Sequence, residues 1–342
     1  MTVSGRIFGR FAGTYPLADT YHRSALASEM VETTARATDL VAEATGLPLT
    51  GLPETTVIDR AQWIDRNVST FSHLTEPAVR QLEERLEERG ASRGTIVLAG
   101  HLVQAETAAI LSVLAKRVLG QYELVLPTGG SGDTVAYVGP NILQMERSRQ
   151  FRPSEFRFWV ALHELTHRAQ FRGVPWMRDY FMGLVTDLVG SARPEPGRLG
   201  RILEELGARR AEGRPLIDQR GLFGLFATPE QNEIVDRVQA LMSLLEGHGH
   251  VVMDRLGAQH LKSQSRMSRI LKERRQDKRT AAFFRLTGLE MKLSQYRLGE
   301  RFVLAVERSA GWESVALAFR GASSLPTLEE IEDPARWLAR VA

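Results

Sequence analysis

The sequence predicts a mainly α-helical protein of the α+β class, with a small β element near the middle of the chain. Long stretches carry apolar residues at the spacing of an amphipathic helix, and only residues 121–142 change to short runs rich in β-formers. Hydrophobic residues make up 43% and charged residues 25% of the 342 positions, which is ordinary for a globular protein and argues against disorder. A chain of this length can bury a large core.

The composition also excludes several kinds of site. The chain has no cysteine, so disulfides, cysteine nucleophiles and thiolate metal sites are excluded, and any metal must be held by His, Asp or Glu. The net charge of +3 is small beside that of dedicated nucleic-acid binders. The first twenty residues lack the apolar core of a secretory signal, and His101 and Glu106 interrupt the longest apolar run. We therefore expect a cytoplasmic protein without a membrane-spanning segment.

Helices are predicted for the N-terminal part of the chain. Apolar residues recur at helical spacing over residues 20–45 and 57–90, and Gly90 and Gly94 follow the charge-rich end of the second stretch as a stop signal. A long alanine-rich helix then runs to Gly120, which ends it.

A β element comes after this helix. The runs QYELVLP (121–127) and DTVAYVGPNI (133–142) are short and rich in β-formers, and the segment TGGSGD between them is typical of a turn. We expect these two runs to form a small hairpin or sheet.

Helical spacing returns after the hairpin. Proline and glycine in residues 191–201 predict a loop within this part of the chain. The final third opens with a basic amphipathic run at residues 262–279, and helix is expected through most of the remaining C-terminal residues. The earlier helices are expected at residues 154–172, about 177–191, about 199–212 and about 229–256.

The apolar stretch FWVALHELTHRAQF, residues 158–171, contains the most informative motif. His163 and His167 are four residues apart, so their imidazoles project from one face of a helix and can reach one ion. With Glu164 they form an HExxH pattern, in which the histidines bind zinc and the glutamate takes a proton from metal-bound water. Zinc lowers the pKa of that water to about 7. The alternative is that the two histidines only make structural hydrogen bonds.

A catalytic zinc site needs a third protein ligand and one open position. The candidate ligand is Glu246, which lies on a second apolar helix in MSLLEGHGHVVMD, residues 242–254. His250 lies four residues later and shares the face of Glu246, whereas His248 should point away from it.

These segments resemble a known family. HELTH followed by LLEGH resembles the ligand pair of the gluzincins, zinc peptidases with a glutamate as third ligand. HELTHRAQFRGVPWMRDY, LLEGHGHVVMD, GLEMKLSQYRLGERF and LPTLEEIEDPARWL resemble the zincin-like metallopeptidase family of actinobacteria and related phyla, one branch of which is associated with coenzyme F420 producers. The resemblance extends from about Asp59 to the end of the chain. It implies zinc at His163, His167 and Glu246, with Glu164 as general base.

The sequence departs from this family at one position. Family members often carry a carboxylate where His250 stands. His250 could support the ligands by hydrogen bonding or stabilise the oxyanion of the transition state, could act as a fourth ligand that closes the site, or could lie on the surface. Tyr296 is a second candidate for the oxyanion donor, and its alternative is an ordinary packing residue.

The resemblance also suggests how substrate is held. Zincins commonly place an edge strand beside the active-site helix, and an extended peptide adds to that strand. The candidate here is strand 133–141, and the alternative is a buried strand without a substrate role. We expect one integrated zincin-like unit over residues 1–342, with a metal-site core at 91–260 between helical parts at 1–90 and 261–342.

The expected function is zinc-dependent hydrolysis of a peptide or amide bond in a peptide or protein substrate, with Zn²⁺ as the cofactor. The alternative is a non-catalytic zinc-containing binding or scaffold protein, which a closed site with His250 as fourth ligand would favour. The run 262–279 has eight basic and two acidic residues but no aromatic residue for base stacking, so a solvated helix face is favoured over nucleic-acid binding. No membrane partner is expected.

Overall fold

The computed structural model describes residues 13, 15, 17, 20–88, 110–124, 132–190, 229–275 and 290–342. The chain divides into two compact units. The first comprises Met1–Pro175 with Arg255–Gln264, and the second comprises Trp176–Asp254 with Ser265–Ala342.

The first unit contains a three-stranded mixed sheet within the described residues. The strands are β1 (Glu54–Ile58), β2 (Gly120–Tyr122) and β3 (Thr134–Val138), in the order β1-β3-β2. β2 pairs with β3 in antiparallel fashion, which confirms the predicted hairpin. β1, which the sequence analysis missed, runs parallel to β3 and places Thr56 opposite Ala136. The helix predicted over residues 57–90 therefore begins later, since residues 57 and 58 belong to β1.

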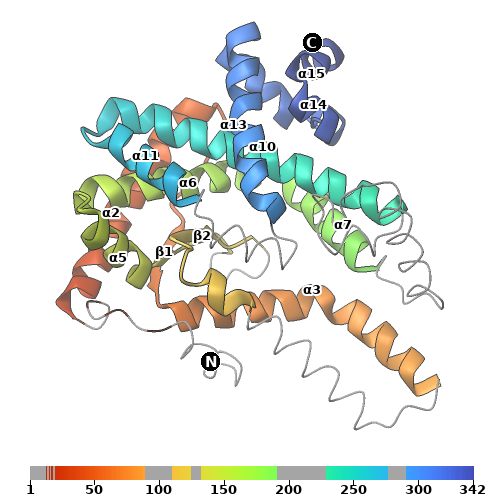
Figure 1. Cartoon of the computed structure of the whole chain (residues 1–342), viewed down its shortest axis with the longest axis horizontal. Helices are drawn as coiled ribbons and strands as arrows, with labels where there is room; N and C mark the ends of the chain where they lie inside the picture. Colours follow the sequence, from red (N-terminus) through yellow and green to blue (C-terminus); the bar gives the residue numbers. More distant parts are fainter. Residues whose placement is uncertain are drawn as a thin grey trace, which may run out of the picture. The chain divides into compact units, whose positions relative to one another are not determined.

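Helices cover both faces of this sheet. α2 (Tyr21–Thr45) and α6 (Pro153–Arg172) lie side by side on one face (Figure 1). The Tyr137 hydroxyl of β3 hydrogen-bonds the Thr34 hydroxyl of α2 at 3.0 Å on this side. Because side chains alternate along a strand, Ala136 and Val138 face the other way.

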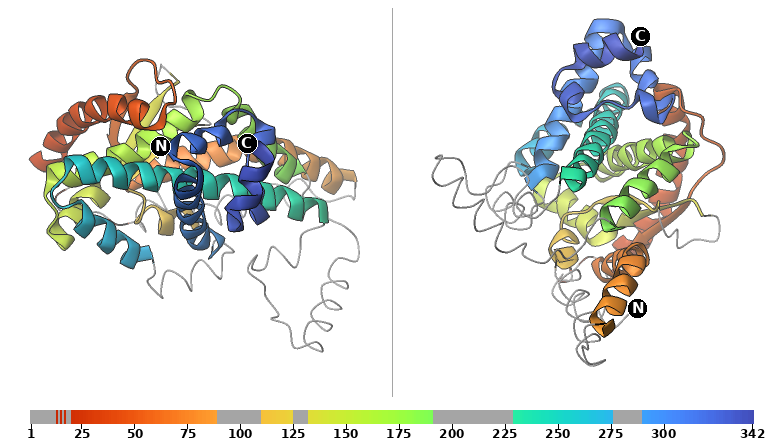
Figure 2. Two further views of the ribbon diagram at one scale, coloured as in Figure 1. Left: turned by 90° about the horizontal axis from the view of Figure 1, so that it is seen from above. Right: turned by 90° about the vertical axis from the view of Figure 1, so that its right-hand side faces the viewer.

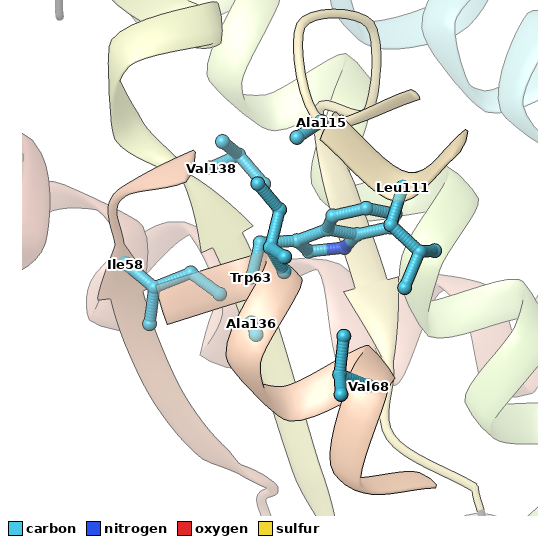
Figure 3. Packing of buried hydrophobic residues seen from close by; sticks show 8 residues of the cluster. Ile58, Trp63, Val68, Leu111, Ala115, Ala136 and Val138 are labelled. Carbon is cyan, nitrogen blue, oxygen red and sulfur yellow. The ribbon is translucent and has the colours of Figure 1, made fainter. Parts of the chain in front are cut away.

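The other face of the sheet carries a separate core. Ala136 and Val138 pack there against Trp63, which belongs to α3 (Arg60–Glu88). Leu111 and Ala115, from the end of the alanine-rich segment, join the same cluster (Figure 3). The sheet thus lies between two helical layers, and α6 packs on the face opposite α3.

Local sequence signals explain where the helices begin and end. The Thr20 side chain caps the first turn of α2 by accepting a hydrogen bond from the backbone of His22, and Gly46 ends this helix in the left-handed conformation with φ 66°. Pro140 lies in the first turn of α5 (Gly139–Arg149), where its missing N–H costs no hydrogen bond. The strand predicted to continue to residue 142 therefore ends at Val138.

Every secondary-structure element in the described part of the second unit is a helix. α13 (Glu290–Ala310) packs against η2 (Trp312–Phe319), α14 (Leu328–Glu332) and α15 (Pro334–Val341) (Figure 2). The Phe302 and Trp337 ring centroids lie 5.2 Å apart in this packing. A capping box between Thr327 and Glu330 begins α14. The described chain also contains α7 (Met177–Gly190), α10 (Pro229–His260), α11 (Gln264–Arg275) and η3 (Ala322–Ser324). The last turns of α10 and the first residue of α11 belong to the first unit.

The predicted fold class is confirmed, because the described chain is mainly helical with one small sheet. The helices expected at 154–172, 177–191 and 229–256 are present as α6, α7 and α10. The helix at 199–212 and the loop at 191–201 lie outside the described residues. In the part of the chain that is described, no helix combines the length and the apolar character that crossing a membrane requires.

Candidate metal centre

The two histidines of the HELTH motif lie together on α6. Their Nε2 atoms are 3.1 Å apart, and the rings meet edge to face with centroids separated by 4.6 Å. Two imidazoles that bind one zinc ion tetrahedrally, with Zn–N bonds of about 2.0–2.1 Å, place their nitrogens about 3.3 Å apart. The same separation fits a hydrogen bond between one protonated and one free nitrogen. The spacing of the pair therefore suits a shared ion and equally suits a direct hydrogen bond.

Gln170 favours one neutral tautomer of the His167 ring, the one with its proton on Nδ1. Its side-chain oxygen lies 2.9 Å from Nδ1 of His167 and accepts a hydrogen bond from it. The proton then resides on Nδ1, which leaves the lone pair of Nε2 free to bind a metal. Gln170 is fully buried, and the sequence analysis did not identify it.

Glu164 points toward the sheet from the same helix. Its side chain is buried, and it lies beside Gly120 at the start of β2. Tyr137 of β3 lies close by: burial raises the pKa of its phenol, the hydrogen bond to Thr34 lowers it, and the negative charge of Glu164 raises it further. The general-base candidate thus occupies a largely dry environment between α6 and two strands.

A buried ion pair attaches this part of α6 to the sheet. Arg168 is fully buried, and its Nε and Nη2 atoms donate to the two carboxylate oxygens of Asp133 at 2.7–3.1 Å. Nη2 also donates to the carbonyls of Thr50 and Gly51 at 3.0 Å. Burial and the nearby charge of Asp133 raise the pKa of the Tyr122 phenol to about 12. The arginine of the motif is therefore a structural residue that holds α6 against the strands.

The second unit presents its own pair of metal-binding groups on α10. Glu246 and His250 are one helical turn apart, and a carboxylate oxygen of the first lies within 4.8 Å of a ring nitrogen of the second. The His250 side chain is only 3% exposed, so the alternative that His250 lies on the surface is wrong. Within the second unit, Glu246 and His250 are therefore two adjacent side chains that could bind a metal ion.

His248 has a packing role in the second unit. Its buried ring stacks on Trp312 of η2, with centroids 5.7 Å apart, and also contacts the ring of Phe319. It lies among aromatic side chains rather than with Glu246, as its position on the helix predicted.

Two glycines set how α13 crosses α10 beside Glu246. A Cβ on Gly299 would lie 1.7 Å from the carbonyl oxygen of Ser243, and a Cβ on Gly247 would lie 2.1 Å from the carbonyl carbon of Gly299. The two backbones can therefore approach this closely only where both residues lack a side chain. This explains why a glycine follows the ligand candidate in LLEGH.

Two predictions on substrate binding have different outcomes. Tyr296 belongs to α13, but its side chain lies outside the described residues, so its role stays a prediction. Strand 133–141 is not an edge strand, because β3 lies between β1 and β2 and is buried throughout. Within the described sheet, the edge strand that contacts α6 is β2.

Comparisons with known proteins support a hydrolase. A family model described as zincin-like metallopeptidase matches residues 7–338. The chain is similar to a solved structure of a "putative hydrolase with a novel fold" from Chloroflexus aurantiacus, with 29% sequence identity and a TM-score of 0.72. That match covers 98% of this chain and 97% of the other. No curated protein matches the chain.

The family match spans nearly the whole chain and includes both segments that carry the candidate ligands. Such a family implies a metal, usually zinc, and the imidazole and carboxylate groups on α6 and α10 suit that ion. The chain belongs to the zincin-like metallopeptidase family.

Proposed function

We propose that this protein is a zinc-dependent metallopeptidase that cleaves a peptide or amide bond. In this proposal His163, His167 and Glu246 bind the zinc ion, and Glu164 acts as the general base. The observation that carries it is the paired Nε2 atoms of the two histidines, 3.1 Å apart on a helix whose next residue after the first ligand is a buried glutamate.

Each residue has a defined part in the proposed reaction. When bound, zinc lowers the pKa of a coordinated water to about 7 and polarises the carbonyl to be cleaved. Glu164 accepts a proton from the attacking water and delivers it to the leaving amine. His250, or Tyr296 in its place, donates a hydrogen bond to the carbonyl oxygen as negative charge develops there.

The burial of Glu164 favours this role. A carboxylate in a dry site makes stronger hydrogen bonds to a nearby water than one in bulk solvent does. The hydrogen bond from His167 to Gln170 favours metal binding, because metal-bound histidines usually donate their other N–H to a neighbouring acceptor.

A second candidate function is suggested by His250. It is buried on the same face as Glu246, so it could bind the ion as a fourth ligand and close the site to solvent. The protein would then be a zinc-containing binding or scaffold protein without peptidase activity. A water molecule among the ligands of the bound ion would exclude this alternative.

The test compares wild type with Glu164→Gln on a library of internally quenched peptides, with zinc content measured by elemental analysis. We expect the variant to keep its zinc and to lose activity by about 10²–10⁴-fold, because the amide cannot accept the proton. Glu313→Gln, at an exposed position on η2, is the matched control and should behave as wild type. Full activity in Glu164→Gln at full zinc content would contradict the assigned base.

The predicted peptide partner and the predicted cytoplasmic location remain predictions. In the basic run 262–279, the Lys272 ammonium lies 2.7 Å from a carboxylate oxygen of Glu300 and 3.6 Å from one of Asp254, so this charge is already matched within the chain. We propose a cytoplasmic enzyme that acts on peptides rather than nucleic acids.

A further inference from the structure

We infer that Gly120 is a positioning residue for Glu164: the missing side chain at the start of β2 sets the orientation of the proposed general base. This inference rests on the proposed function, because Glu164 matters there as the group that accepts the proton. It concerns only residues of the first unit, and it assigns a part in the reaction to a residue outside the HELTH motif.

The distances show that Glu164 fills the space of a side chain on β2. A Cβ on Gly120 would lie 2.7 Å from Cγ, 2.8 Å from Cδ and 2.9 Å from Oε1 of Glu164. Real Cβ atoms essentially never approach other heavy atoms this closely. All three atoms belong to one side chain, so any residue other than glycine at position 120 collides with the glutamate rather than with the backbone of α6.

Hydrogen bonds hold the chain on both sides of Gly120. The backbone N–H of Val138 donates to the carbonyl of Leu119 at 2.9 Å, directly before Gly120. The Asn141 side-chain amide donates to the carbonyl of Val118 at 2.6 Å. On the next residue, the Gln121 side-chain oxygen accepts a hydrogen bond from the indole of Trp63 at 2.7 Å. A side chain added at Gly120 must therefore displace the flexible end of Glu164.

Backbone conformation does not explain this glycine. The described glycines with positive φ are Gly13, Gly46, Gly51, Gly132 and Gly311, and Gly120 is not among them. It forms a regular ladder pair with Tyr137, a conformation that any residue can adopt. Position 120 needs a residue without a side chain, because the Glu164 side chain occupies the space where a Cβ would lie.

Displacing Glu164 has a specific consequence for catalysis. A general base must lie within hydrogen-bond reach of the proton it takes, and a misplacement of about 1 Å can cost about 10²-fold in rate. The three heavy atoms nearest to the added methyl group all belong to Glu164, so the glutamate, and not a proposed ligand, is the side chain that it meets first. Gly120→Ala should therefore retain zinc and substrate affinity and lose turnover.

The experiment compares Gly120→Ala with Gly321→Ala by crystal structure, zinc content and steady-state kinetics on the best-cleaved peptide of the quenched library. Gly321 is the matched control, because it is also extended, with φ −176°, and a Cβ there would meet nothing within 4 Å. We expect Gly120→Ala to move the Glu164 carboxylate and to lower kcat by about 10²-fold, with KM within about twofold of wild type. Gly321→Ala should match wild type in all three measurements.

Two results would overturn the inference: a Gly120→Ala structure in which Glu164 keeps its orientation, or a kcat within about threefold of wild type. Failure of the proposed function can be distinguished from failure of this inference, because wild type itself would then cleave no peptide of the library. In that case the crystal structure of Gly120→Ala still decides whether Gly120 orients Glu164.

Discussion

His167 shows how a single neighbour can prepare a side chain for metal binding. A free imidazole exchanges between two neutral tautomers, and only one of them presents an unprotonated Nε2. Gln170 favours that tautomer, because its amide oxygen beside Nδ1 can only accept a hydrogen bond, and it does so from a buried position one turn along the same helix. The proposed ligand is therefore oriented before any ion arrives.

Removing this hydrogen bond should weaken metal binding. We expect Gln170→Leu to lower the affinity for Zn²⁺ by about 10–100-fold, since partners of metal-bound histidines contribute this much. Competition with a chelating dye measures the affinity directly. Thr166→Val is the control on the same helix, because its hydroxyl bonds only the backbone carbonyl of Leu162. An unchanged affinity in Gln170→Leu would show that the amide does not orient His167.

At the scale of single residues, the sequence predicted those candidate site residues that belong to a recognisable motif. His163, Glu164 and His167 are predicted by spacing, because positions four apart share a helix face. Gln170 and Gly120 could not be identified in this way. A glutamine three residues after a histidine occurs in many helices, and Gly120 was interpreted as a helix stop because its contact with Glu164 is made between positions 44 apart in the sequence.

At the scale of elements, the crossing of α10 and α13 is the most constrained feature near the candidate ligands. Each helix contributes one glycine, and the added Cβ of either would overlap backbone atoms of the other helix. Backbone atoms cannot rotate away as a flexible side chain can, so the helices themselves would have to move apart. The placement of Glu246 therefore depends on this crossing.

Gly299→Ala should be strongly destabilising. We expect a loss of about 3 kcal/mol or more in the free energy of unfolding, measured by urea denaturation, because the new methyl group overlaps the Ser243 carbonyl. Gly183→Ala on α7 is the matched control in the same unit. A Cβ there meets nothing within 4 Å, so alanine should be neutral or stabilising through its higher helix propensity. Equal stability of the two variants would refute the close crossing.

The elements that the sequence predicted best are those with a strong local pattern. α2, α6, α7 and α10 have long apolar periodicity, and their bounds agree closely with it. β1 is only five residues long, with the burial of its side chains increasing toward Ile58, and it is stabilised by parallel pairing with β3 about 80 residues away. Local patterns do not encode such a pairing, and for the same reason the central position of β3 was not foreseen.

At the scale of the whole molecule, the proposed ligands come from both compact units. His163 and His167 belong to the first and Glu246 to the second, so the proposal needs two segments 79 residues apart in sequence to bind one ion. Sequence spacing alone could not establish this pairing, because a connecting segment of this length can adopt many paths.

Anomalous diffraction at the zinc absorption edge, from crystals of the full chain grown with Zn²⁺, tests the proposed metal centre most directly. We predict one strong peak bound by Nε2 of His163, Nε2 of His167 and a carboxylate oxygen of Glu246, at about 2.0–2.2 Å from each, with a water in the remaining position. A zinc ion held without Glu246, or no peak at the two histidines, would contradict the account.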